Sequence, residues 1–199
     1  MASFGALYIL EAHDTSLLEP IGHWLSAHGF GPAERVATVP SSFESFHLAA
    51  DAAVLDRLND DWHMLELNGF KLSRRHLDTD VVRSLAERLG KRVVFFAGQT
   101  TSDAYQLVVF DGSVVLRSIM VGDGQCVDNE GARLPGEREN AFSFDSSSDD
   151  EEEDDDPPSP MDDLKAICAA LGFALWEGPL SGPVHVWKRR SVMSRLFGR

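Results

Sequence analysis

The stretch RVVFFAGQTTSDAYQLVVFDGSVVLRSIMV (92–121) contains three runs of β-branched and aromatic residues, at 92–98, 104–112 and 113–121. Such runs are typical of β-strands. The second and third runs meet at Asp111-Gly112, where glycine tolerates the positive φ of a tight hairpin turn. The stretch therefore predicts a β-meander over 92–121, and with it a largely antiparallel sheet at the centre of the fold.

Two segments outside this stretch predict helices that pack on the sheet. DTDVVRSLAERLG (78–90) has acids in its first turn, one apolar face and a closing Gly90. In residues 161–172 an apolar stripe follows Ser159-Pro160, a helix cap and first-turn proline, and Gly172 stands where the helix should end. Because this last helix again has an apolar face, we expect the chain to return to the core after residue 160.

The N-terminal region predicts a buried strand followed by a helix. ALYILEA (6–12) is continuously apolar, as expected of a strand buried on both faces. SLLEPIGHWLSAH (16–28) has helical spacing, and Ser16 with Glu19 has the spacing of a capping box. Gly29 then suits the left-handed position that closes a helix.

The remaining segments have weaker patterns. Residues 41–60 predict one or two short helices, and 61–70 predict a strand that ends in an Asn-Gly turn. Residues 122–144 are rich in turn-forming types and predict a loop. FALWEG (173–178) and PVHVWKRR (183–190) predict a final pair of strands. The fold class is thus α+β, a single domain over 1–199 with helices packed on its sheet.

An acidic run interrupts this domain. Residues 145–156 contain nine of the 32 Asp and Glu residues and no base, within a formal net charge of -14. So many adjacent carboxylates cannot bury enough apolar surface to offset the entropy of ordering, so we expect 145–160 to be a disordered loop. A chain this negative should also repel a phosphate backbone, which argues against nucleic-acid binding.

Three interpretations of the acidic run stay open. It is a solvated insertion that joins two parts of one fold, a docking segment for a basic partner, or a target for acidophilic kinases. The kinase interpretation rests on Ser146, Ser147 and Ser148, each with an acid three residues downstream. The docking interpretation assigns partner binding to eight carboxylates: Asp149, Asp150, Glu151, Glu152, Glu153, Asp154, Asp155 and Asp156.

The C-terminal residues 188–199 predict a basic tail. Together with Trp187, the bases of this tail alternate with apolar residues, which is compatible with an amphipathic helix on an anionic membrane or on a partner. Alternatively, the tail pairs with the acidic loop of its own chain. No segment has the roughly 20 apolar residues of a membrane span, and the N-terminus lacks a secretory signal.

Motifs for chemistry are weak. GDGQCV (122–127) lacks the third glycine of a dinucleotide loop and the alternating oxygen ligands of a calcium loop, so we expect no cofactor and no metal. His13 and Asp14 follow the first strand, a place where functional groups often lie. Convergence with His76 and Asp78 would be needed for an acid–base pair or a metal site. Helix capping and solvation explain these residues equally well.

One stretch carries a family resemblance. DGSVVLRSIMVGDGQCVDNEGARLPGE (111–137) resembles a pattern of small uncharacterised bacterial α+β proteins. The pattern is a strand pair joined at a glycine, an Arg-Ser on the second strand and a loop ending in G-x-x-L-P-x-E. Its residues here are Gly112, Arg117, Ser118, Gly131, Leu134, Pro135 and Glu137. The resemblance implies a bacterial α+β domain and transfers no catalytic residue.

The sequence favours a non-enzymatic, cytoplasmic interaction protein of the immunity, antitoxin or adaptor kind that binds a basic protein. Two cysteines, Cys126 and Cys168, make no disulfide framework and fit a reducing compartment. The alternatives are a small metal-dependent hydrolase centred on His13 and Asp14, and a peripheral membrane factor that uses residues 187–199.

Overall fold

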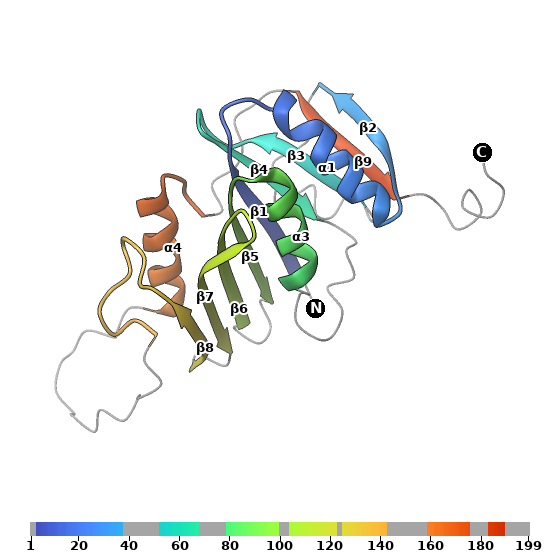
Figure 1. Ribbon diagram of the computed structural model, residues 1–199. Coiled ribbons are helices and arrows are strands. Elements are labelled where there is room, and N and C mark those ends of the chain that lie inside the picture. Colours follow the sequence, from blue (N-terminus) through green and yellow to red (C-terminus); the bar gives the residue numbers. More distant parts are fainter. Residues whose placement is uncertain are drawn as a thin grey trace.

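A computed structural model describes residues 3–37, 52–67, 79–99, 104–122, 125–142, 159–175 and 183–189. Within these residues, three helices accompany a sheet of nine strands (Figure 1). The helices are α1 (Thr15–Ala27), α3 (Thr79–Leu89) and α4 (Pro160–Leu171). The strands are β1 (Ser3–Leu10), β2 (Phe30–Val36), β3 (Ala52–Arg57), β4 (Trp62–Leu67), β5 (Arg92–Gln99), β6 (Ala104–Asp111), β7 (Val114–Gly122), β8 (Gln125–Gly131) and β9 (Val184–Arg189).

The sheet has the strand order β2-β9-β3-β4-β1-β5-β6-β7-β8. Every neighbouring pair is antiparallel. The sheet is open, so β2 and β8 are its two end strands. The mixed α+β class and the antiparallel sheet agree with the sequence-based prediction.

Both faces of the sheet are buried around β1. Leu7 and Ile9 point into one core cluster together with apolar residues of α1 and α3. Ala6 and Tyr8 point into a second cluster together with apolar residues of α4. We call these the first and the second face. Because successive side chains alternate between faces, a strand covered on both sides must be continuously apolar, as ALYIL is.

The helices divide between the two faces. α1 and α3 contact each other and lie side by side across the first face (Figure 1). α3 contacts β5 and β6, whereas α4 covers the second face near β7. Phe173, which follows α4, stacks on Tyr8 with ring centroids 4.4 Å apart. The second face therefore receives its cover from the segment on the C-terminal side of the acidic run.

Several local predictions are confirmed. α3 and α4 begin and end where the caps indicate, with Pro160 in the first turn of α4 and Gly172 at a φ of 101°. Gly112 has a φ of 55° in the turn between β6 and β7, and Gly29 has a φ of 88° after α1. Glycine adopts these conformations without the steric cost that a Cβ atom would impose.

Three predictions about element type were wrong within the described residues. The 52–57 part of the segment expected to be helical is strand β3, and residues 41–51 lie outside the described part. The expected loop 122–144 contains strand β8. Residues 173–175 of the expected strand FALWEG are not in a strand, although β9 forms as expected.

The predicted capping box at the start of α1 is also wrong. Asp14 is the residue at the cap position and makes no side-chain capping bond. Ser16 lies inside the first turn, where its hydroxyl donates to the His13 carbonyl at 2.8 Å. Ser16 therefore lies two residues beyond the cap position and cannot form a capping box with Glu19. Among the described residues, no helix is long and apolar enough to span a membrane.

Candidate functional site

The partner-binding carboxylates and the three modification serines predicted at 146–156 lie outside the described residues. The structure describes where the chain leaves and where it returns. Phe142 is 3% exposed and its carbonyl accepts a hydrogen bond from the Asn129 amide. Ser159 and Pro160 begin α4, which packs on the second face. Both ends of the acidic run are therefore held by the folded core.

The negative charge of the protein is concentrated around this run. Residues 122–163 contain 16 of the 32 Asp and Glu residues and only two of the 18 Lys and Arg residues. This stretch thus carries a formal charge of -14, equal to the net charge of the whole chain, and the remainder is balanced. In the structure the stretch includes β8, the segment 132–142 and the first turn of α4.

A buried ion pair anchors the segment that precedes the run. Arg117 on β7 donates from two guanidinium nitrogens to the two carboxylate oxygens of Glu137, and its Nη1 donates to the Glu130 carbonyl at 2.9 Å. The Arg117 and Glu137 side chains are 3% and 5% exposed. Glu137 also accepts from the Leu134 amide at 3.1 Å. The planar guanidinium matches the carboxylate in a bidentate geometry, which fixes the position of residues 134–137 on the sheet.

Two glycines allow this segment to approach its neighbours closely. Gly131 has a φ of 91°, and a Cβ atom there would lie 2.2 Å from the Leu116 carbonyl oxygen. Gly136 has a φ of 83°, and its Cβ would lie 2.5 Å from the carbonyl oxygen of Ala166 in α4. In this chain, the close approach at the two glycines and the hydrogen bond from the Leu134 amide to Glu137 together fix the position of residues 131–137.

A second ion pair joins the segment to α4. Arg138 donates from Nε to Oδ1 of Asp163 and from Nη2 to Oδ2 of the same carboxylate. The distance between Nη2 and Oδ2 is 2.6 Å. The Asp163 side chain is 3% exposed, whereas half of the Arg138 side chain is exposed. The Asp163 carboxylate lies in the first turn of α4, where the helix dipole also favours a negative charge. The two segments that flank the acidic run are thus connected to each other.

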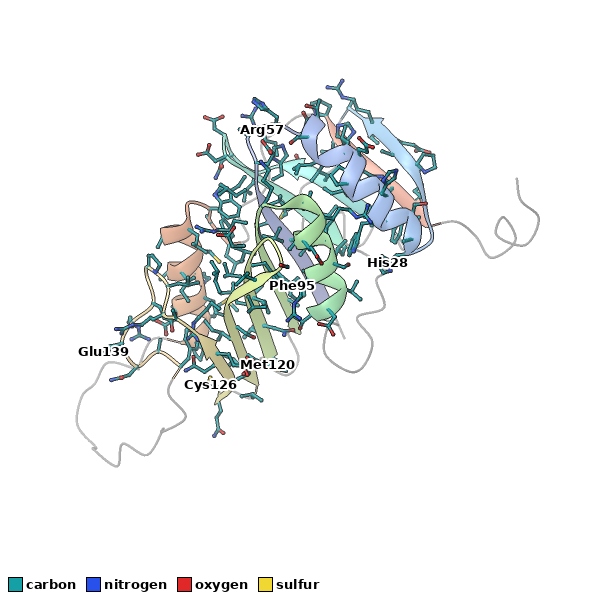
Figure 2. All side chains as sticks on the ribbon, in the orientation of Figure 1. His28, Arg57, Phe95, Met120, Cys126 and Glu139 are labelled. Carbon is teal, nitrogen blue, oxygen red and sulfur yellow. The ribbon has the colours of Figure 1, made fainter. Side chains whose placement is uncertain are left out.

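Strand β8 borders the same region and is the end of the sheet. Val127 is 57% exposed on this strand. Asp128 accepts a hydrogen bond from Ser118 on β7 at 2.9 Å, whereas Glu130 is exposed. Figure 2 shows Cys126 of β8 and Met120 of β7 at this end of the sheet. The polar composition of residues 125–131 concealed this strand from sequence analysis.

The structure describes only His13 and Asp14 of the four residues that the sequence singled out around this strand end. His13 is exposed, while Oδ2 of Asp14 lies 3.5 Å from Nε2 of His185 on β9. His76 and Asp78 lie outside the described residues. Within the described part of the chain, no group of three His, Cys, Asp or Glu side chains is arranged to hold a metal ion.

His63 on β4 is a buried residue that sequence analysis missed. One of its ring nitrogens, Nδ1, donates to the Glu11 carbonyl at 2.8 Å, and burial lowers the pKa of the ring. Nε2 is buried and has no hydrogen-bond partner among the described residues. The expected alternation in 61–70 placed this histidine in a strand, but it gave no sign that His63 would lie on a covered face.

A pocket of about 460 Å³ lies at the nearby end of the sheet. Its charged groups are largely paired with one another: Lys91 with Glu11 at 2.9 Å, and Arg92 with Asp111 at 3.3 Å. The hydrogen bond from Lys91 is the main reason why the pKa of Glu11 falls to about 2. These two ion pairs connect the ends of the neighbouring strands β1, β5 and β6 at the pocket.

Residues 187–189, where the predicted basic tail begins, belong to strand β9. Trp187 belongs to β9 and is 1% exposed in the core of the first face. On the same strand, Nζ of Lys188 lies 3.1 Å from Oε2 of Glu34 on β2. Residues 190–199 lie outside the described part.

Comparison of the chain with models of protein families, with curated proteins and with solved structures finds no match.

Proposed function

We propose that this chain is a non-enzymatic protein-interaction module, of the immunity, antitoxin or regulatory-adaptor kind, which binds a basic protein partner. The observation that carries the proposal is the segregation of charge. All of the formal net charge of -14 belongs to residues 122–163, and the folded core holds this stretch on both sides of the acidic run.

Concentrated charge has a defined physical effect on association. A region of one sign raises the local concentration of oppositely charged molecules and increases association rates, by as much as about 10–10³-fold at low ionic strength. The carboxylates of residues 149–156 would provide most of this attraction. Phe142 and Ser159, on the two sides of the run, belong to the folded core, whose surface can add apolar and backbone contacts.

The ion pairs at the flanks support this assignment of roles. Arg138 is paired with Asp163, and Arg117 of β7 is paired with Glu137, so carboxylates of the fold engage both bases. Besides Arg138, residues 122–163 contain only one other base, Arg133. A basic partner would therefore meet a strong excess of carboxylates in this stretch.

Affinity purification tests the proposal with three tagged proteins: the full chain, a variant without residues 145–158, and a variant of full length in which Asp149–Asp156 become Asn or Gln. The last variant is the matched control, because it removes charge but keeps the length of the insertion. We expect the full chain to retain a basic protein, with retention weakening as salt rises and falling at least about tenfold in both variants. Equal retention of that protein by the amide variant would contradict the proposal.

A further inference from the structure

The open edge of β8 is a second feature of the acidic end of the sheet. β8 pairs with β7 on one side. Among the described residues, no strand pairs with its other side. An end strand of this kind presents a row of backbone N–H and C=O groups that can pair with an added strand.

The two end strands differ in how well they are protected against such pairing. β2 contains Pro32, which has no N–H to donate, and its register with β9 shifts between Phe30 and Ala33. β8 contains no proline. Its register shift lies near its beginning, and Asp128–Gly131 then pairs regularly with Arg117–Met120. The last four residues of β8 therefore pair regularly with β7 and contain no proline, although the Glu130 carbonyl already accepts from Arg117.

The side chains of β8 combine apolar and acidic groups. Val127 is 57% exposed, and Glu130 is also exposed. α3 packs on β5 and β6, so the described helices of the first face do not extend over β8 (Figure 1). An added strand could cover Val127 while its cationic side chains lie beside Glu130.

We infer that the β8 edge binds a basic extended segment of the partner protein by strand addition. This inference rests on the proposed function and specifies its binding mode. Charge selects the occupant: a second copy of β8 would place acid beside acid, whereas Lys or Arg in the added strand would face opposite charge. Backbone pairing provides affinity, and the excess of acidic residues in 122–163 increases the rate of encounter.

A peptide of twelve alternating Lys and Val residues serves as the probe. The comparison peptide has the same side chains and charge but carries N-methyl groups on alternate backbone nitrogens, so it cannot form one row of hydrogen bonds. We expect the N-methylated peptide to bind the full chain at least about tenfold more weakly, because several backbone hydrogen bonds of about 1 kcal/mol each are lost. Equal binding of both peptides would overturn the inference.

Two matched charge reversals locate the binding edge. Glu130→Lys changes β8, and Glu34→Lys makes the same change on β2. We expect Glu130→Lys to weaken binding of the Lys–Val peptide about fivefold or more, and Glu34→Lys to change it by less than about twofold. The reverse order would overturn the inference. Circular dichroism of both variants checks that the fold is retained.

Hydrogen exchange separates this inference from the proposed function. We expect the peptide to slow exchange of amides in residues 125–131 of the full chain and of the amide variant alike. Protection of β2 instead, or of neither edge, overturns the strand-addition inference. Failure of the proposed function has a different readout, namely equal capture of the basic partner by the amide variant and the full chain.

Discussion

Substitution of Glu137 by alanine tests the ion pair that anchors the acidic end. In Glu137→Ala the Arg117 guanidinium would stay buried, at 3% exposure, without the carboxylate that accepts two of its hydrogen bonds. Loss of one partner of a buried ion pair costs about 3–5 kcal/mol. The Leu134 amide also loses its acceptor, which adds about 1 kcal/mol. Against a typical unfolding free energy of about 5–15 kcal/mol, this is a large part of the total.

Thermal and urea unfolding, followed by circular dichroism, measure this effect. We expect Glu137→Ala to lower Tm by about 10–20 °C, from about 2–4 °C per kcal/mol for a chain of this size. Replacing both partners, as Arg117→Met with Glu137→Leu, should restore most of the loss because no unpaired charge remains. Glu139→Ala is the control, since Glu139 is exposed and lies at the outside of the same segment (Figure 2).

Two results would refute this reasoning. One is a Tm of Glu137→Ala within about 3 °C of the unsubstituted chain, which would mean that the guanidinium readily finds water or another acceptor. The other is a double variant less stable than Glu137→Ala. A large loss in the Glu139→Ala control would instead indicate that the whole segment tolerates no substitution, and the ion pair would not be the cause.

Three further predictions follow from single residues. Gly131→Ala should destabilise the fold by more than about 1 kcal/mol in urea unfolding, because the new Cβ would meet the Leu116 carbonyl at a φ of 91°; an unchanged midpoint would contradict this. Burial raises the pKa of Asp56 to about 6, so the folded state holds this proton more tightly than the unfolded state. The protonated Asp56 side chain therefore makes its full contribution to the free energy of unfolding below about pH 4. This contribution, at most about 3 kcal/mol, is lost as pH rises through 6. Asp56→Asn should abolish that part of the pH dependence of unfolding, and an unaltered profile would refute it. Burial also raises the pKa of the Cys168 thiol to about 12, so iodoacetamide at pH 8 should label native Cys168 only after unfolding, as read by mass spectrometry.

Local patterns predicted those elements whose residues agree with their own secondary structure. β5, β6 and β7 consist of residues that favour strands, and Gly112 occupies a turn that needs a positive φ. α3 has an apolar stripe, charged ends and a closing glycine, all within 13 residues of sequence. In such segments propensity, capping and periodicity point to the same structure.

β3 and β8 were missed because tertiary contacts override local preference. Residues 52–55 are rich in alanine and have helical spacing in sequence, yet all four are buried in the sheet between β4 and β9. β8 has the composition of a loop, and its strand exists because its backbone pairs with β7. The residues of β3 and of β8 do not by themselves show which strands these segments pair with.

The candidate site divides in the same way. The acidic run and its return to an apolar helix could be read from the sequence, since charge and apolar periodicity are properties of neighbouring residues. Three contacts could not be read in this way: Arg117 with Glu137, Arg138 with Asp163, and His63 with the Glu11 carbonyl. Each depends on atoms brought together over long sequence separations. Composition thus predicts an acidic insertion within an α+β fold, because charge is a property of the residues themselves. Only long-range packing determines that the described residues on its two sides, Phe142 and α4, lie in the core of the second face.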